Sequence, residues 1–133
     1  MALFRNQLLR QQGPSAVVVA IKYFTAPVKA NYARHGSVSE QAQTRYLRAL
    51  MAHDSDLVEI TQGFHIFQPT SLPVHVPDQM PSKDQRQRVW MIEEKLTDVQ
   101  LALTVYRDAL RDGVDQVVVC SNDLDVEPAF KRS

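Results

Sequence analysis

The fold prediction rests first on residues 16–24, which read AVVVAIKYF. This run is almost continuously apolar and rich in β-branched and aromatic residues, without the alternation of a half-exposed strand. Such a run is typical of a strand that is covered on both faces, as in parallel sheets. Residues 115–120, DQVVVC, have the same character. The two runs therefore predict central, parallel strands with helices on each face.

Three helices are predicted around these strands, and a fourth is predicted to begin near Asp125. Apolar residues recur with helical spacing near the N-terminus, and Gly13-Pro14 ends that helix. Ser37 and Glu40 fit a capping box that opens a second helix, which continues to about His53. Residues 97–110 form the clearest helical pattern, with a stop at Gly113.

Shorter strands are predicted at residues 57–60 and 88–92. Residues 63–67 either continue the first of these or form its hairpin partner. Residues 69–84 contain four prolines and are predicted to be a loop. Because helices and strands alternate, the sequence predicts an α/β fold with three layers, helices on both sides of a mostly parallel sheet.

Length and composition indicate one globular domain. The chain has 133 residues and a mass of 15.1 kDa, and its hydrophobic share of 44% is ordinary for a soluble protein. Its one cysteine, Cys120, excludes an internal disulfide and is predicted to be buried within the last strand. No apolar run approaches the roughly 18–20 residues of a membrane span. We therefore predict a soluble, cytoplasmic protein.

The formal net charge is zero, but the charges are divided unevenly between the two parts of the chain. Residues 1–52 contain seven Lys/Arg and one acid, whereas residues 53–133 contain eight Lys/Arg and fourteen acids. A basic half can attract a polyanion, and an acidic half can hold a cation. Chance segregation of solvated side chains is the other interpretation of these counts.

Three aspartates are candidate metal ligands. Asp123 and Asp125 follow the predicted strand 115–120 and so lie at the carboxyl edge of the sheet, where open α/β sheets bind ligands. Asp98 opens the helix 97–110 in line with its small apolar face, which directs it toward the same edge. Converging carboxylates need a cation, and oxygen ligands suit Mg²⁺ or Mn²⁺. Asp125 could instead simply cap a helix.

Four segments resemble the bacterial NYN domains of the PIN-like nuclease superfamily. They are IKYFTAPVKA (21–30), QTRYLRAL (43–50), EEKLTDVQLALTVYRDAL (93–110) and DQVVVCSNDLDVEP (115–128). The resemblance runs through most of the chain and implies a Rossmann-like αβα sandwich with an acidic, Mg²⁺- or Mn²⁺-dependent site. Family members begin with a strand of the form DGxN, which this chain lacks. The resemblance thus implies that residues 1–133 are a partial domain, without the first acidic strand and the C-terminal end.

The resemblance also assigns residues to roles. Asp98, Asp123 and Asp125 match the acids that hold the metal and activate water. Ser121 and Asn122 match the polar lead-in to the last two acids and would contact a phosphate. We expect basic residues of the N-terminal half, among them Lys22, Lys29 and Arg45, to follow an RNA backbone.

Three functions follow from the resemblance. The first is a metal-dependent ribonuclease that hydrolyses RNA phosphodiesters. The second is a catalytically inactive fragment that binds RNA or a protein partner. The third is a pyridine-ring monooxygenase role, which related sequences carry, although no flavin or haem motif is present. Because a missing strand leaves sheet edges uncovered, we also expect a homo-oligomer.

Overall fold

The computed structural model describes residues 2–121, with side chains from residue 5 onward. Three helices and four strands follow one another along this part of the chain. In order they are α1 (Ala2–Gln12), β1 (Ile21–Thr25), α2 (Ser37–His53), β2 (Val58–Gln62), β3 (Phe64–Pro73), β4 (Arg86–Lys95) and α3 (Thr97–Ala109).

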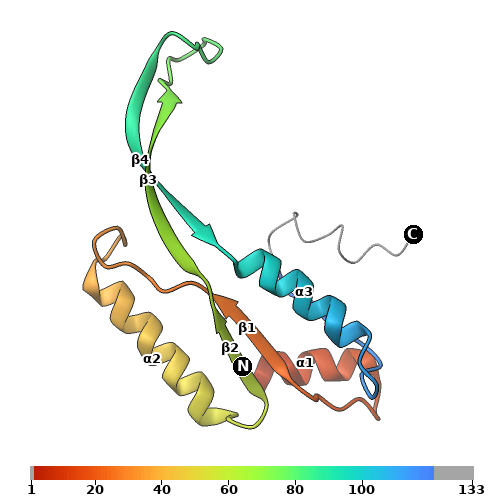
Figure 1. Ribbon diagram of the computed structural model, residues 1–133. Coiled ribbons are helices and arrows are strands. Elements are labelled where there is room, and N and C mark those ends of the chain that lie inside the picture. Colours follow the sequence, from red (N-terminus) through yellow and green to blue (C-terminus); the bar gives the residue numbers. More distant parts are fainter. Residues whose placement is uncertain (1, 122–133) are drawn as a thin grey trace.

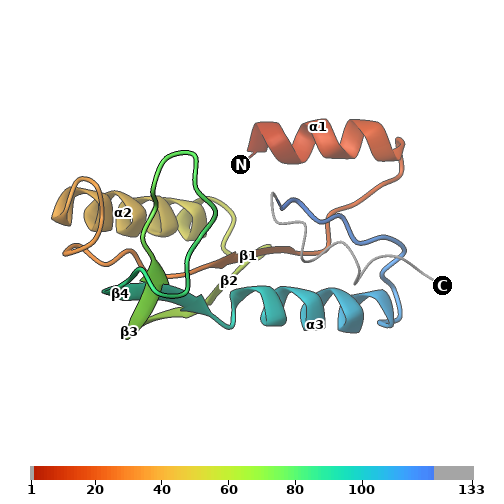
Figure 2. The same ribbon diagram turned by 90° about the horizontal axis from the view of Figure 1, so that it is seen from above.

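β1 and β2 form a short parallel pair, in register from Ile21 opposite Val58 to Thr25 opposite Gln62. α2 provides the crossover connection that parallel strands require. Seen from above, α1 and α2 lie on one side of this pair and α3 lies on the other (Figure 2). The pair is therefore the centre of a small three-layered body.

β3 and β4 form a separate antiparallel hairpin that projects away from the helices (Figure 1). Its register runs from Phe64 opposite Lys95 to Pro73 opposite Arg86. The predicted strand 88–92 is confirmed and is longer than expected. The predicted loop over 69–84 is wrong in its first part, because β3 continues through Pro69 and Pro73. Proline is tolerated there, since each hairpin strand has one free edge on which no N–H group is needed.

The predicted Rossmann-like αβα sandwich with a mostly parallel sheet is wrong. The described residues contain two two-stranded sheets, one parallel and one antiparallel. Of the run 16–24 only the part from Ile21 is a strand, and Val17 and Val19 before it are 81% and 59% exposed. Residues 115–120 form no strand, and Cys120 is exposed rather than buried. An apolar run becomes a strand only where a neighbouring strand satisfies its backbone groups.

Three of the predicted helices are confirmed as α1, α2 and α3, and the fourth lies outside the described residues. The predicted capping box is not confirmed. The N-cap of α2 is Gly36, and no side chain caps the helix. Gly36 has a positive φ of 56°, a backbone conformation that glycine adopts without strain. The turn before α2 thus depends on this glycine, and Ser37 is already helical.

The buried core of the described residues is small. It consists of Ala26, Leu47, Leu50 and Val58, which join the end of β1, the inner face of α2 and the start of β2. Much larger apolar side chains stay open to solvent, among them Trp90 at 67% and Tyr106 at 66% exposed. None of the described helices combines the length and apolar character needed to cross a membrane.

Candidate functional site

The carboxyl ends of β1 and β2 meet the start of α3 in close backbone contact. The amide N–H of Gly63, directly after β2, donates to the carbonyl of Thr25 at the end of β1 (2.8 Å). A Cβ atom at position 63 would lie 2.5 Å from the carbonyl oxygen of Lys95 and against Oγ1 of Thr97. The first turn of α3 therefore lies at the carboxyl edge of the parallel pair.

This placement puts Asp98 at the edge where the sequence analysis expected a site. Asp98 belongs to the first turn of α3 and is exposed. Asn122, Asp123 and Asp125 lie outside the described residues, so the convergence of the three acids stays a prediction. Within residues 2–121, no three His, Cys, Asp or Glu side chains gather closely enough to hold a metal ion.

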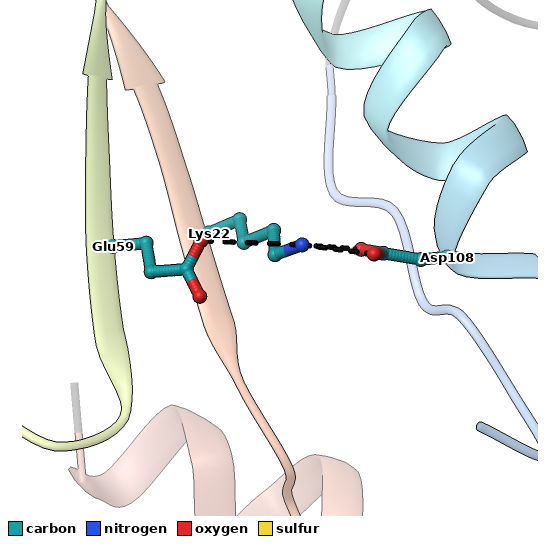
Figure 3. A network of polar contacts seen from close by, with 3 residues as sticks. All are labelled: Lys22, Glu59 and Asp108. Atoms are coloured by element: carbon teal, nitrogen blue, oxygen red, sulfur yellow. Dashed lines mark hydrogen bonds and ion pairs between the residues drawn. The ribbon is translucent and has the colours of Figure 1, made fainter. Parts of the chain in front are cut away.

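Lys22, one of the predicted phosphate contacts, is engaged within the protein. Its Nζ lies 2.8 Å from both carboxylate oxygens of Asp108 on α3, and 4.0 Å from Glu59 on β2 (Figure 3). The side chains of Lys22 and Asp108 are only 22% and 21% exposed. The pair therefore ties β1 to α3 across the body of the protein.

Lys29 and Arg45, the other predicted basic contacts, are exposed, on the loop after β1 and on α2. Ser121 is exposed as well. Asn122 lies outside the described residues, so the gathering of these contacts around Asp98 stays a prediction.

A double-mutant cycle measures the ion pair of Lys22. Lys22→Met combined with Asp108→Leu is expected to reveal a coupling energy of about 1–2 kcal/mol in urea unfolding, because both groups are largely removed from solvent. Glu59 is 66% exposed and more distant, so a matched cycle with Glu59→Gln should give no measurable coupling. Equal coupling in the two cycles would show that the ion pair with Asp108 has no special structural role.

The loop over residues 26–36 is held in place by Gln43 of α2. Its side-chain oxygen accepts the amide N–H of Val28 (2.7 Å), and its side-chain nitrogen donates to the carbonyl of Ala26 (2.8 Å) and to the hydroxyl of Thr25 (3.3 Å). One amide side chain thus satisfies both backbone groups of a non-regular segment, as such groups require. These hydrogen bonds fix the position of Ala26 and Val28, from which the rest of the loop continues.

A hollow of about 340 Å³ lies between this loop and the base of β3. It is lined by Lys29, Ala30, Asn31, Tyr32, Glu40 and Phe67. The rings of Tyr32 and Phe67 are stacked, with centroids 4.5 Å apart and an interplanar angle of 29°. Tyr32 is nevertheless 57% exposed, so part of its ring stays open to solvent.

The hollow combines aromatic surface with charged and amide groups. An open ring face binds planar molecules by stacking, and an exposed ammonium such as that of Lys29 attracts a carboxylate. No sequence pattern singles out Tyr32, Phe67 or Gln43. An isolated tyrosine in the polar stretch NYARHGS was a signal for Tyr32, but nothing in the sequence pairs it with Phe67.

No protein-family model matches the chain, and no solved structure matches it significantly. A comparison with known proteins found similarity to 6-hydroxy-3-succinoylpyridine 3-monooxygenase HspA of Pseudomonas putida. The two are 36% identical over 116 residues, which are 84% of this chain and 36% of the relative. The chain therefore spans about a third of the length of this relative.

This similarity overturns the ribonuclease prediction, because the relative is a monooxygenase and no comparison supports a nuclease. Of the acids that predicted a metal site, Asp98 at the helix start is exposed, and Asp123 and Asp125 lie outside the described residues. The resemblance to NYN domains, the Mg²⁺ or Mn²⁺ ion and the RNA partner are not tested by these comparisons and stay predictions.

Proposed function

We propose that this chain is the part of a monooxygenase that binds an aromatic N-heterocyclic substrate bearing an acidic side chain. The observation that carries the proposal is its 36% identity, over 84% of its residues, to an enzyme named for 6-hydroxy-3-succinoylpyridine. The pyridine-ring role was the third function considered from the sequence, and this similarity now favours it.

A monooxygenase adds one atom of O₂ to its substrate and reduces the other atom to water. The balance requires two electrons and two protons from a reductant, of the nicotinamide or flavin class. The sequence contains no glycine-rich dinucleotide fingerprint, so we assign no residue of this chain to a reductant. The role that we propose for the described residues is substrate binding.

The hollow beside Tyr32 suits such a substrate. The open part of the Tyr32 ring would stack on a pyridine ring, a contact worth about 0.5–1.5 kcal/mol. Lys29 lines the same hollow and carries the charge that a succinoyl carboxylate would pair with. Glu40 and Asn31 offer an acceptor and an amide to a ring hydroxyl.

Binding of 6-hydroxy-3-succinoylpyridine to the purified chain tests the site. We expect saturable binding in calorimetry, and an affinity loss of about fivefold to tenfold for Tyr32→Ala, which removes the stacking surface. Lys29→Gln should weaken binding of this acid but not of a neutral hydroxypyridine.

The matched controls are Tyr106→Ala and Lys83→Gln, which remove an exposed tyrosine and an exposed lysine that do not line the hollow and should leave binding unchanged. Absence of binding, or equal losses in the controls, would contradict the proposed substrate site. Incorporation of ¹⁸O from labelled O₂ into the product, with a nicotinamide and a flavin supplied, tests the monooxygenase reaction itself.

A further inference from the structure

Among the described residues, one edge of β4 has no partner strand. β4 pairs with β3 along one side, and that sheet contains no other strand among the described residues. The hairpin projects from the helical body, so neither α2 nor α3 covers it along its length (Figure 1). A ten-residue strand with a free row of N–H and C=O groups is a template for a further strand.

The charges of β4 are arranged so that the strand complements itself. Its sequence, RQRVWMIEEK, places two arginines before Trp90 and two glutamates after it. If two copies of the strand run antiparallel about a two-fold axis at Trp90, Arg86 lies opposite Glu94 of the second copy. In the same register Gln87 lies opposite Glu93. Because the axis repeats every contact, each opposite-charge pair occurs twice.

The side chains beside the axis also suit contact with a second copy. Trp90 and Ile92 point to the same face of the hairpin, since alternate residues of a strand share a face, and they are 67% and 42% exposed. Trp90 of each copy would meet its counterpart across the axis. Such aromatic pairs are among the favourable cross-strand contacts.

We propose that two copies of this chain associate through β4, which forms a continuous antiparallel sheet in the order β3, β4, β4, β3. The proposal is independent of the substrate site, which lies at the base of β3. Pairing one strand edge buries less area than a standard stable interface, so the dimer is concentration-dependent, with a dissociation constant on the order of micromolar.

Charge reversal tests the register. Sedimentation velocity at low salt, from low to several hundred micromolar protein, should show a monomer–dimer equilibrium. Arg86→Glu or Glu94→Arg alone places like charges opposite each other twice per dimer and should weaken association by about tenfold or more. The double variant restores opposite charges and should restore association.

Arg48→Glu and Asp112→Arg make the same charge changes on α2 and after α3, and should leave association unchanged. The proposal is overturned if the double variant associates no more tightly than the single variant with the weaker association. It is also overturned if the chain stays monomeric at every concentration.

Cross-linking separates this interface from any other. With Cys120→Ser as background, Trp90→Cys places two thiols directly opposite each other, where strand partners have Cα atoms about 4.5–5.5 Å apart, within disulfide range. Arg88→Cys lies on the same strand and face, but its counterpart in the second copy is four positions away along the strand. Rapid disulfide formation is expected for Trp90→Cys only. Dimers of Trp90→Cys that form without this disulfide would show that another surface pairs.

Discussion

Replacing Gly63 with alanine is expected to lower the free energy of unfolding by about 3 kcal/mol or more, as overpacking against a rigid neighbour does. The added methyl group would lie 2.5 Å from the carbonyl oxygen of Lys95 and against Thr97. The first of these atoms belongs to the backbone at the junction of β4 and α3, so it cannot move without shifting both elements. Urea unfolding followed by circular dichroism measures the loss.

Gly13→Ala provides the control for this prediction. Gly13 has a positive φ of 116°, so an alanine there is strained, but no atom lies within 4 Å of the added methyl group. Its cost should therefore be limited to conformational strain of about 1–2 kcal/mol. If Gly63→Ala and Gly13→Ala lowered the free energy of unfolding equally, close packing at Gly63 would not explain the loss. Thr97→Ala should relieve the Gly63→Ala variant only in part, because the contact with the Lys95 carbonyl remains.

The sequence predicts the helices of this protein much better than its strands. α2 and α3 end within a few residues of the predicted bounds, because helical spacing is a local property and each helix satisfies its own backbone groups. Strands depend on a partner that lies elsewhere in the chain. The valines at 17–19 and 117–119 have high strand propensity, but no neighbouring strand pairs with them within residues 2–121.

The candidate site, like the strands, depends on contacts between distant parts of the chain. The carboxyl-edge rule placed the expected site at the ends of strands, and Asp98 lies in the first turn of α3, beside the ends of β1 and β2. The hollow lined by Lys29, Tyr32 and Phe67 arises from a contact between the loop after β1 and the base of β3. Local patterns do not encode such a contact, because Tyr32 and Phe67 are distant in sequence. The kind of ligand that the hollow suits can be inferred only when the positions of both rings are known.

Gln43 links the fold to the proposed substrate site. Its side chain holds the backbone of Ala26 and Val28, and the loop that begins there carries Lys29 and Tyr32. Gln43→Met keeps a side chain of similar length but removes these hydrogen bonds. Leaving two backbone groups without their partner is expected to lower the free energy of unfolding by about 2 kcal/mol or more.

The same variant should weaken substrate binding, because a loosened loop must be ordered again when the ligand binds. We expect faster hydrogen exchange at the Val28 amide and an affinity for 6-hydroxy-3-succinoylpyridine reduced by about tenfold, with smaller effects at amides within α2. Gln41→Met, at an exposed position of the same helix, is the matched control and should change neither quantity. If exchange at Val28 accelerates while binding is unchanged, Gln43 holds the loop but the loop does not bind the substrate. If exchange at Val28 also stays the same, the hydrogen bond from Val28 to Gln43 does not protect that amide in solution, and the position of the loop must come from the stacking of Tyr32 on Phe67.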